Sequence, residues 1–427
     1  MDDFYKMDTM DNLAFLFNGK AYPYVPQVKV TLSEKILPDI LRDAIVKTQK
    51  RYKLLQVRYV ETRKYHGYVD NNADLMLLNV PFHEKITVGK PTNDYPWVFS
   101  YDENDIVFTF FHGLFDGRTS IEIMKTALFY YFSQLGVKIE ESPYVKTLHD
   151  ADLLSLMERE TEVSFKNRKN LQCEPLPEKP TVKGDLIDKK YLTDARVAYM
   201  LRMDTAQLLA VCKRLETTPF SLLSLLIVKS VCGFAEKENP VLKFAVLADV
   251  RKILGTQTLK NCVMQIPLNY DVAKMEKLSL ETAVTMYRSI LDVSLNYDNV
   301  IATLRRSTVF IDMVEKIKAK WLRKIIKNNV VQIGLGTDFT FLFSYFSKTE
   351  LPQAMSERIV GLEFYQSNLF SPIEILAQAY QDRFEILFVD NLNTHQYLDN
   401  LIAMLDALGC SCDMQELGEY KACSYEP

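Results

Sequence analysis

The apolar and polar positions of the first 135 residues predict a strand, a helix and then a series of strands. Val25 to Leu32 is apolar and β-branched, which favours a strand, and Ser33-Glu34 is typical of the start of a helix that continues to about Lys50. Shorter apolar runs, each bounded by polar residues, predict further strands at Lys53 to Val60, Asp74 to Leu78, Trp97 to Ser100 and Asp105 to Phe111. A helix from about Thr119 to Gln134 follows them, with Gly136 as its stop.

The second half of the chain repeats this mixture of strands and helices. The predicted strands are Ala195 to Met203, Lys243 to Ala248, Val263 to Leu268, Phe339 to Phe346, Leu362 to Tyr365, Glu374 to Tyr380 and Arg383 to Phe388. The predicted helices are Asp204 to Leu215, Pro219 to Ala235, Leu278 to Val293, Met313 to Asn328 and His395 to Leu408. Charged and proline residues dominate 164–193, so we predict an α+β protein with an N-terminal half over 1–163, a linker over 164–193 and a C-terminal half over 194–427.

Charge and composition exclude several classes of function. The 51 Lys and Arg residues nearly balance the 55 Asp and Glu residues, leaving a net charge of −4, so we expect no nucleic-acid partner. The longest uncharged apolar stretch, Thr217 to Val228, is shorter than the roughly 18 to 20 residues that cross a bilayer, so we expect no transmembrane segment. The acidic start, Met1-Asp2-Asp3, differs from a secretory signal, and we expect a cytoplasmic protein.

The cysteines indicate neither a disulfide framework nor a metal site. Seven cysteines, an odd number in a large chain, are most simply reduced thiols. Their one cluster, Cys410, Cys412 and Cys423, has no CxxC spacing and no nearby histidine. We therefore expect no metal, and we expect these residues to be free surface thiols near a loose C-terminus.

One motif carries chemistry: the segment His112-Gly113-Leu114-Phe115-Asp116-Gly117 has the pattern HxxxDG. His112 ends a very apolar predicted strand, and Gly117 permits the turn into the next helix. A neutral imidazole with a pKa near 6.5 can take a proton from a hydroxyl or amine, while Asp116 is placed to bind a basic residue and hold the loop. The structural alternative is a buried core histidine followed by an aspartate that caps the helix.

Around this motif the chain resembles the acyl-CoA-dependent acyltransferases with an HxxxDG motif. This superfamily contains chloramphenicol acetyltransferase, the condensation domains of non-ribosomal peptide synthetases, alcohol acetyltransferases and the plant BAHD enzymes. The resemblance extends to Leu247-Ala248-Asp249-Val250-Arg251 and to Asn261-Cys262-Val263, although Lys260 replaces the glycine of the family's Gly-Asn element. It implies that Arg251 pairs with Asp116; the alternative is a solvated arginine at a strand end.

The resemblance also implies the fold and the reaction. It predicts two chloramphenicol acetyltransferase-like halves with a tunnel between them and His112 at the middle of the tunnel. His112 would act as general base in direct transfer of an acyl group, acetyl among the candidates, to a hydroxyl or amine of a small molecule, without an acyl-enzyme. Acyl-coenzyme A would be a co-substrate, with no permanently bound cofactor, and a monomer would contain a complete site.

The donor of a hydrogen bond to the oxyanion is predicted from the strand Phe341 to Ser347. It resembles the family's late strand but keeps only the serine of the Ser-Asn-x-Gly element, so Ser344 and Tyr345 are the candidates. Because side chains alternate along a strand, these two residues face opposite sides. The alternative is a half-buried strand whose hydroxyls are hydrogen-bonded for structural reasons.

Two further alternatives concern the partner and the class of protein. The predicted helix Met313 to Lys327 has a cationic face that suits either coenzyme A phosphates or an acidic acyl carrier protein, or is simply solvated. A stand-alone condensation-type enzyme would take its acyl group from such a carrier. A non-catalytic module of the same fold would bind a partner through the tunnel.

Overall fold

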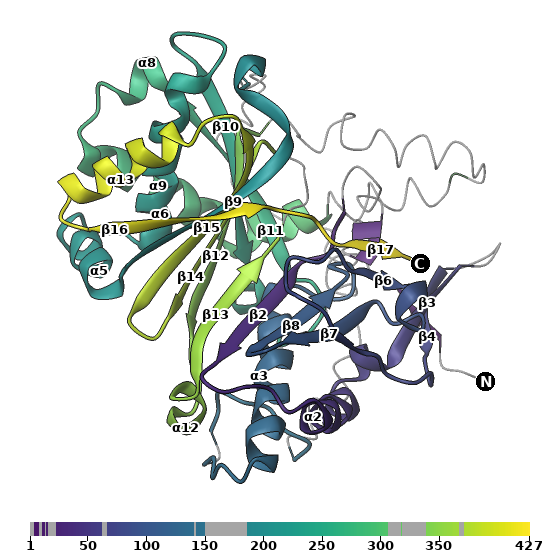
Figure 1. Cartoon of the computed structure of the whole chain (residues 1–427). Helices are drawn as coiled ribbons and strands as arrows, with labels where there is room; N and C mark the ends of the chain where they lie inside the picture. The colour runs from purple at the N-terminus through teal and green to yellow at the C-terminus, as the bar shows by residue number, and fades with distance from the viewer. Residues whose placement is uncertain are drawn as a thin grey trace.

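The computed structural model describes residues 4–7, 11–12, 14–15, 23–61, 66–140, 142–149, 186–305, 317, 339–366 and 371–427. Figure 1 shows two lobes, each with a sheet and helices packed on it. The predicted helix over 313–328 lies outside the described residues except for Ile317, as does most of the predicted linker.

The N-terminal lobe contains a five-stranded sheet and two long helices. Its strands, in spatial order, are β13 (Ile359–Tyr365), β2 (Gln27–Leu32), β8 (Asp105–Phe110), β7 (Trp97–Asp102) and β5 (Leu77–Asn79). Helices α2 (Pro38–Arg51) and α3 (Gly117–Gln134) pack on each other and share one hydrophobic core with this sheet. Stacked rings of Phe99, Phe108, Phe110 and Phe115 fill the centre of that core. The apolar run before the motif is therefore a buried central strand.

The C-terminal lobe is built on a seven-stranded mixed sheet. Its spatial order is β11 (Val263–Asp271), β10 (Val241–Asp249), β12 (Phe341–Thr349), β14 (Ile373–Tyr380), β15 (Arg383–Leu392), β9 (Leu192–Asp204) and β16 (Cys412–Glu419). Four helices pack against one face: α5 (Thr205–Arg214), α6 (Pro219–Val231), α9 (Leu280–Ser294) and α13 (Gln396–Ala407). The other face meets the N-terminal lobe, because alternate residues such as Met200, Leu376 and Leu387 join the core of that lobe.

The two lobes also exchange backbone. β13 comes from the C-terminal part of the chain yet pairs antiparallel with β2, as Figure 1 shows where the light green strand lies beside the purple one. At the end of the chain, β17 (Ser424–Glu426) pairs with β6 (Thr87–Gly89). A third small sheet contains β1 (Phe4–Lys6), β4 (His66–Asp70) and β3 (Val57–Glu61). The lobes are thus tied together by main-chain hydrogen bonds as well as by side chains.

Short helices complete the described chain. The α-helical turns are α7 (Arg251–Leu254), α8 (Val272–Met275) and α12 (Gln353–Ser356), and the 3₁₀ turns are η1 (Lys53–Gln56), η2 (Lys90–Thr92), η4 (Lys189–Tyr191) and η5 (Cys232–Phe234). In the described part of the chain no single helix is long and apolar enough to cross a membrane. Helix α5 and the helical segment Pro219–Phe234, which contains α6, are long and apolar enough for a membrane span only when they are counted together. The chain bends by 90° between them.

Several local predictions were wrong. Helix α2 starts at Pro38 rather than at Ser33, because a proline at the first helical position has no N–H to leave unpaired and already has a helical φ. The strand predicted from Lys53 starts only at Val57, after a 3₁₀ turn. The C-terminus is not loose: it forms β16 and β17, and Cys410 and Cys423 are buried. Periodicity alone did not reveal these short strands because their partners lie far away in sequence.

A buried carboxyl group makes the stability of the C-terminal lobe depend on pH. Asp390 on β15 is fully buried, and burial raises its pKa to about 6, although the hydroxyl of Tyr397 and the N–H of Leu392 donate to it. Because the folded state holds this proton more tightly than the unfolded state, the free energy of unfolding falls as pH rises from about 4 to about 6.

We therefore expect Asp390→Asn to become more stable relative to wild type by up to about 3 kcal/mol over that pH range, and the difference to stay constant above it. Urea denaturation at pH 4.5, 5.5, 6.5 and 7.5 measures this, with exposed Asp406→Asn as the control. If the stability difference between Asp390→Asn and wild type does not change with pH, the raised pKa of Asp390 is contradicted.

Candidate active site

The main chain on both sides fixes His112 at the end of β8. The N–H of Phe111 donates to Pro96 O at 2.7 Å, and the N–H of His112 donates to Tyr24 O at 2.9 Å. These bonds extend the sheet pairing beyond β8. His112 is only 7% exposed, so its imidazole is held inside the molecule on a rigid support.

Among the described residues, the polar contacts of the imidazole ring are made by Nδ1. Nδ1 lies 3.2 Å from Phe115 O and faces the carbonyl of His112 itself, so the ring proton is assigned to Nδ1, which donates to these acceptors. Asn261 Nδ2 lies 3.2 Å from His112 Nδ1 and 3.4 Å from His112 O, and with Nδ1 protonated it donates to the carbonyl. Burial lowers the pKa of His112, with Asp116 opposing that shift. Burial therefore favours the neutral ring, and with the proton assigned to Nδ1 the lone pair lies on Nε2.

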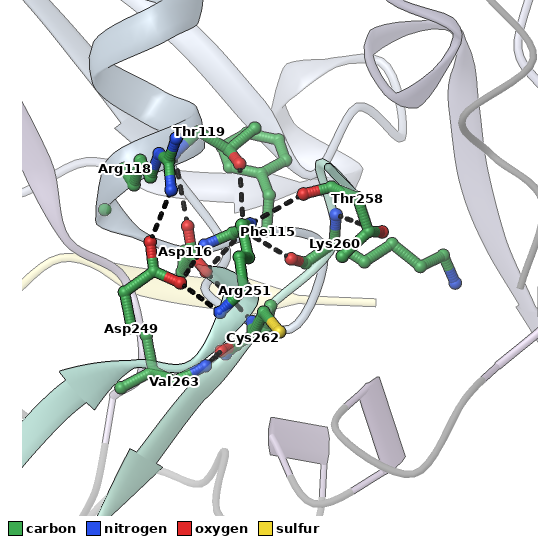
Figure 2. A network of polar contacts seen from close by, with 12 residues as sticks. Phe115, Asp116, Arg118, Thr119, Asp249, Arg251, Thr258, Lys260, Cys262 and Val263 are labelled. Atoms are coloured by element: carbon green, nitrogen blue, oxygen red, sulfur yellow. Dashed lines mark hydrogen bonds and ion pairs between the residues drawn. The ribbon is translucent and has the colours of Figure 1, made fainter. Parts of the chain in front are cut away.

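Asp116 caps helix α3 and also binds the arginine expected from the sequence. Its Oδ1 accepts from the N–H of Thr119 at 3.1 Å, and its Oδ2 accepts from the N–H of Cys262 at 2.9 Å. Arg251 Nη2 lies 2.7 Å from the same Oδ2, as Figure 2 shows. The helix cap and the ion pair, considered as alternatives from the sequence, are thus both present.

Arg251 is the centre of this network. Its Nε donates to Thr258 O and its Nη2 to Lys260 O, each at 2.7 Å, and its Nη1 lies 3.2 Å from Asp249 Oδ1 (Figure 2). Arg251 is 3% exposed, so the alternative of a solvated arginine is wrong. Burial opposes its charge, but Asp116 and Asp249 offset this and raise its pKa.

Lys260, which stands where the sequence pattern that this chain resembles has a glycine, has its own partner. Its ammonium lies 2.8 Å from Asp11 Oδ2, and both side chains are buried. The main-chain carbonyl of Lys260 still reaches Arg251. The lysine at position 260 is therefore accommodated by a second buried ion pair. This pair joins Asp11 of the N-terminal segment to the loop that contains Lys260.

Gly117 is required by close packing between the lobes. A Cβ atom built on this residue would lie 2.5 Å from Cε1 of Phe346 on β12, far closer than two carbon atoms approach. The ring of Phe346 in turn packs on Phe364, with centroids 4.6 Å apart. The end of the motif thus lies against β12 of the other lobe.

Ser344 and Tyr345, the two predicted oxyanion donors, lie on opposite faces of strand β12. Tyr345 packs between Phe220 and Phe384 in the core of the C-terminal lobe, and burial raises its pKa. Ser344 lies on the face of Phe346, which looks toward the motif. The structure therefore does not bring Tyr345 to the motif, because strand alternation turns it into the helix-covered core.

Two contacts of His112 were not assigned from the sequence. Asn261 was noted as part of a family element but received no role, and its hydrogen bonds to His112 appear only once β11 is placed beside the motif. Tyr24 gave no signal, yet its ring stacks on the imidazole at 4.5 Å. In the described part of the chain no cluster of three or more potential ligands is suited to a metal ion.

No protein-family model and no curated protein sequence matches this chain. Solved structures do match it over most of its length. TRI101 of F. sporotrichioides, crystallised with coenzyme A and T-2, is 9% identical, covers 98% of this chain and 100% of its own, and gives a TM-score of 0.62. The starter condensation domain of rhizomide synthetase, in complex with C8-CoA, is 8% identical, covers 95% and 94%, and gives 0.61.

The epimerization domain of tyrocidine synthetase B is 12% identical, covers 96% of both chains and gives a TM-score of 0.59. At these identities the likeness shows the fold. The chain is an α+β protein with the two-lobed architecture of the condensation domains and chloramphenicol acetyltransferase-like acyltransferases, which confirms the predicted fold class. The tunnel between the halves stays a prediction.

The buried ion pair generates a prediction about stability. Arg251→Met leaves Asp116 buried without its cation, so we expect a loss of about 3–5 kcal/mol in the free energy of unfolding. Arg118→Met is the matched control, because it removes only a pair with Asp249 in which the arginine side chain is 59% exposed, and it should cost no more than about 1 kcal/mol. Urea denaturation measures the free energy of unfolding of both variants. Equal losses in the two variants would show that the buried pair stabilises the fold no more than the exposed pair does.

Proposed function

We propose that this protein is an acyltransferase that moves an acyl group from a coenzyme A thioester to a hydroxyl or amine of a small molecule. The observation that carries the proposal is the geometry of His112: Nδ1 lies 3.2 Å from the main-chain carbonyl of Phe115, which assigns the ring proton to Nδ1 and leaves the lone pair on Nε2 to act as a base. The fold shared with structures that contain coenzyme A, ethyl coenzyme A and C8-CoA supports the choice of donor.

In the proposed reaction, Nε2 of His112 takes the proton of the acceptor's hydroxyl or amine as the acceptor's oxygen or nitrogen attacks the thioester carbonyl. The tetrahedral intermediate then breaks the carbon–sulfur bond, and the departing thiolate receives the proton from Nε2. Transfer is direct, no acyl-enzyme forms, and His112 ends each cycle neutral. Coenzyme A enters and leaves as a co-substrate, and we propose no permanently bound cofactor.

The other site residues serve this base. Asp116, Gly117 and Arg251 hold the loop that places His112, through the cap and the ion pair described above. We assign the oxyanion donor to Ser344, since it shares a strand face with Phe346, which packs on the motif. Because both lobes come from one chain, a monomer suffices, and the cytoplasmic location expected from the sequence belongs to the same proposal.

A second candidate donor is an acyl group on a carrier protein. The observation in its favour is that condensation and epimerization domains give TM-scores close to those of the acetyltransferases. The chemistry at His112 would be the same, and only the group attached to the thioester would differ.

We expect His112→Ala to abolish acceptor-dependent release of coenzyme A while leaving the melting temperature within a few degrees of wild type. Release is followed by chromatography with acetyl- and octanoyl-coenzyme A and a panel of alcohols and amines. His83→Ala, which changes an exposed histidine, is the control and should keep full activity. Turnover with a carrier-bound thioester alone would favour the second donor, and ligand binding without turnover from any donor would favour a non-catalytic module.

The pH profile supplies a separate check. The rate falls as pH falls through the pKa of His112, because protonation of Nε2 removes the base. Since burial lowers that pKa below its ordinary 6.5, kcat/KM at pH 6.5 should exceed half of its maximum. An acid limb centred above pH 6.5 would contradict the role of His112 as the titrating base.

A further inference from the structure

The imidazole of His112 must become cationic during the proposed reaction, although it is buried. A buried cation needs a compensating group, and in a catalytic triad an aspartate that contacts the histidine provides it. Here the carboxylate of Asp116 is committed to Thr119, Cys262 and Arg251, and within the described residues no hydrogen bond joins it to the imidazole. Asp116 therefore acts on His112 only through space, and Arg251 largely balances its charge.

One aromatic ring covers the imidazole. The rings of Tyr24 and His112 lie with centroids 4.5 Å apart and planes inclined by 11°, so the face of the tyrosine lies on the face of the histidine. The negative face of an aromatic ring stabilises a cation more than a neutral partner, and the effect is larger where water is excluded. Phe110 on β8 lies farther from the imidazole, with ring centroids 6.3 Å apart and planes inclined by 61°, so these two rings are not stacked.

The backbone holds Tyr24 in this position. Its carbonyl accepts the N–H of His112, so a single residue contacts both the main chain and the ring of the histidine. Tyr24 lies in the segment Pro23-Tyr24-Val25-Pro26, where the two prolines have fixed φ angles and the second favours extended backbone at Val25. Pro26 O also accepts from the N–H of Phe110, which ties this segment to β8.

We propose that Tyr24 is a positioning residue whose ring face stabilises the imidazolium form of His112 during acyl transfer and fixes the plane of the imidazole. Among the described residues, the groups that face His112 are Asp116 from the loop before α3, Asn261 from the loop before β11, Phe110 from β8 and Tyr24 from the segment before β2. Of these, Tyr24 is the one whose ring stacks on the imidazole. The mechanistic part of this inference rests on the proposed function, whereas the stacking itself can be tested without turnover.

The test compares Tyr24→Leu, which removes the aromatic face but keeps an apolar side chain, with Tyr24→Phe, which keeps the face and removes the hydroxyl. The titration of His112 is followed by NMR of histidine-labelled protein, in which five histidines give five signals and His112→Ala identifies the one of interest. We expect Tyr24→Leu to lower the titration midpoint of His112 by about 0.4 to 1.5 pH units and Tyr24→Phe to leave it close to wild type. The other four histidines should titrate as before, which shows that the fold is intact.

Kinetics provide the second readout. In Tyr24→Leu, kcat should fall by about 2- to 30-fold with little change in KM, and the acid limb of the pH profile should move to lower pH. An unchanged midpoint in Tyr24→Leu, or an equal shift in Tyr24→Phe, would overturn the proposal, the second because it would implicate the hydroxyl. If wild type shows no turnover with any donor, the proposed function fails, while the NMR titration still decides whether the ring face stabilises the cation.

Discussion

The buried ion pair between Asp116 and Arg251 is the constraint on which the site depends. Asp116 caps the N-terminus of α3 in the N-terminal lobe, and Arg251 begins α7 in the C-terminal lobe, so their 2.7 Å contact fixes one lobe against the other beside His112. Two buried charges lose much hydration, and only additional hydrogen bonds make such a pair favourable. Here Thr119, Cys262, Thr258 and Lys260 provide them through main-chain groups. Of these hydrogen bonds, the one from the Cys262 N–H to Asp116 also joins the two lobes.

Within the six-residue motif, Asp116 and His112 have different kinds of contacts. The aspartate caps a helix and joins two lobes, while the histidine is oriented by main-chain carbonyls and by the ring of Tyr24. In a Ser-His-Asp triad one carboxylate both orients the base and balances its charge. In this protein no hydrogen bond between described residues joins Asp116 to the imidazole; the carboxylate accepts instead from Thr119, Cys262 and Arg251.

Strand alternation at the interface decides which side chains reach the site. The large sheet places Tyr345 against its own helices and Phe346 against Gly117 of the motif, and Ser344 shares the strand face of Phe346. The ring of Phe346 occupies the space where a side chain on Gly117 would lie, so the glycine is a requirement of packing between lobes. β13 adds main-chain pairing across the same interface, which makes the site a product of both lobes.

The sequence by itself determined the strongly periodic elements and the local chemistry of the motif. The run before His112 is apolar enough to be a core strand, and Asp116 followed by Gly117 is ordinary helix-start chemistry, so β8 and the start of α3 follow from neighbouring residues. The pairing of Arg251 with Asp116 was expected only through the family resemblance. Contacts from distant segments were decided by tertiary structure alone: Asn261 and Tyr24 reach His112 because β11 and the segment before β2 lie on either side of it. No local pattern encodes such contacts, since they depend on where the sheet places each strand end.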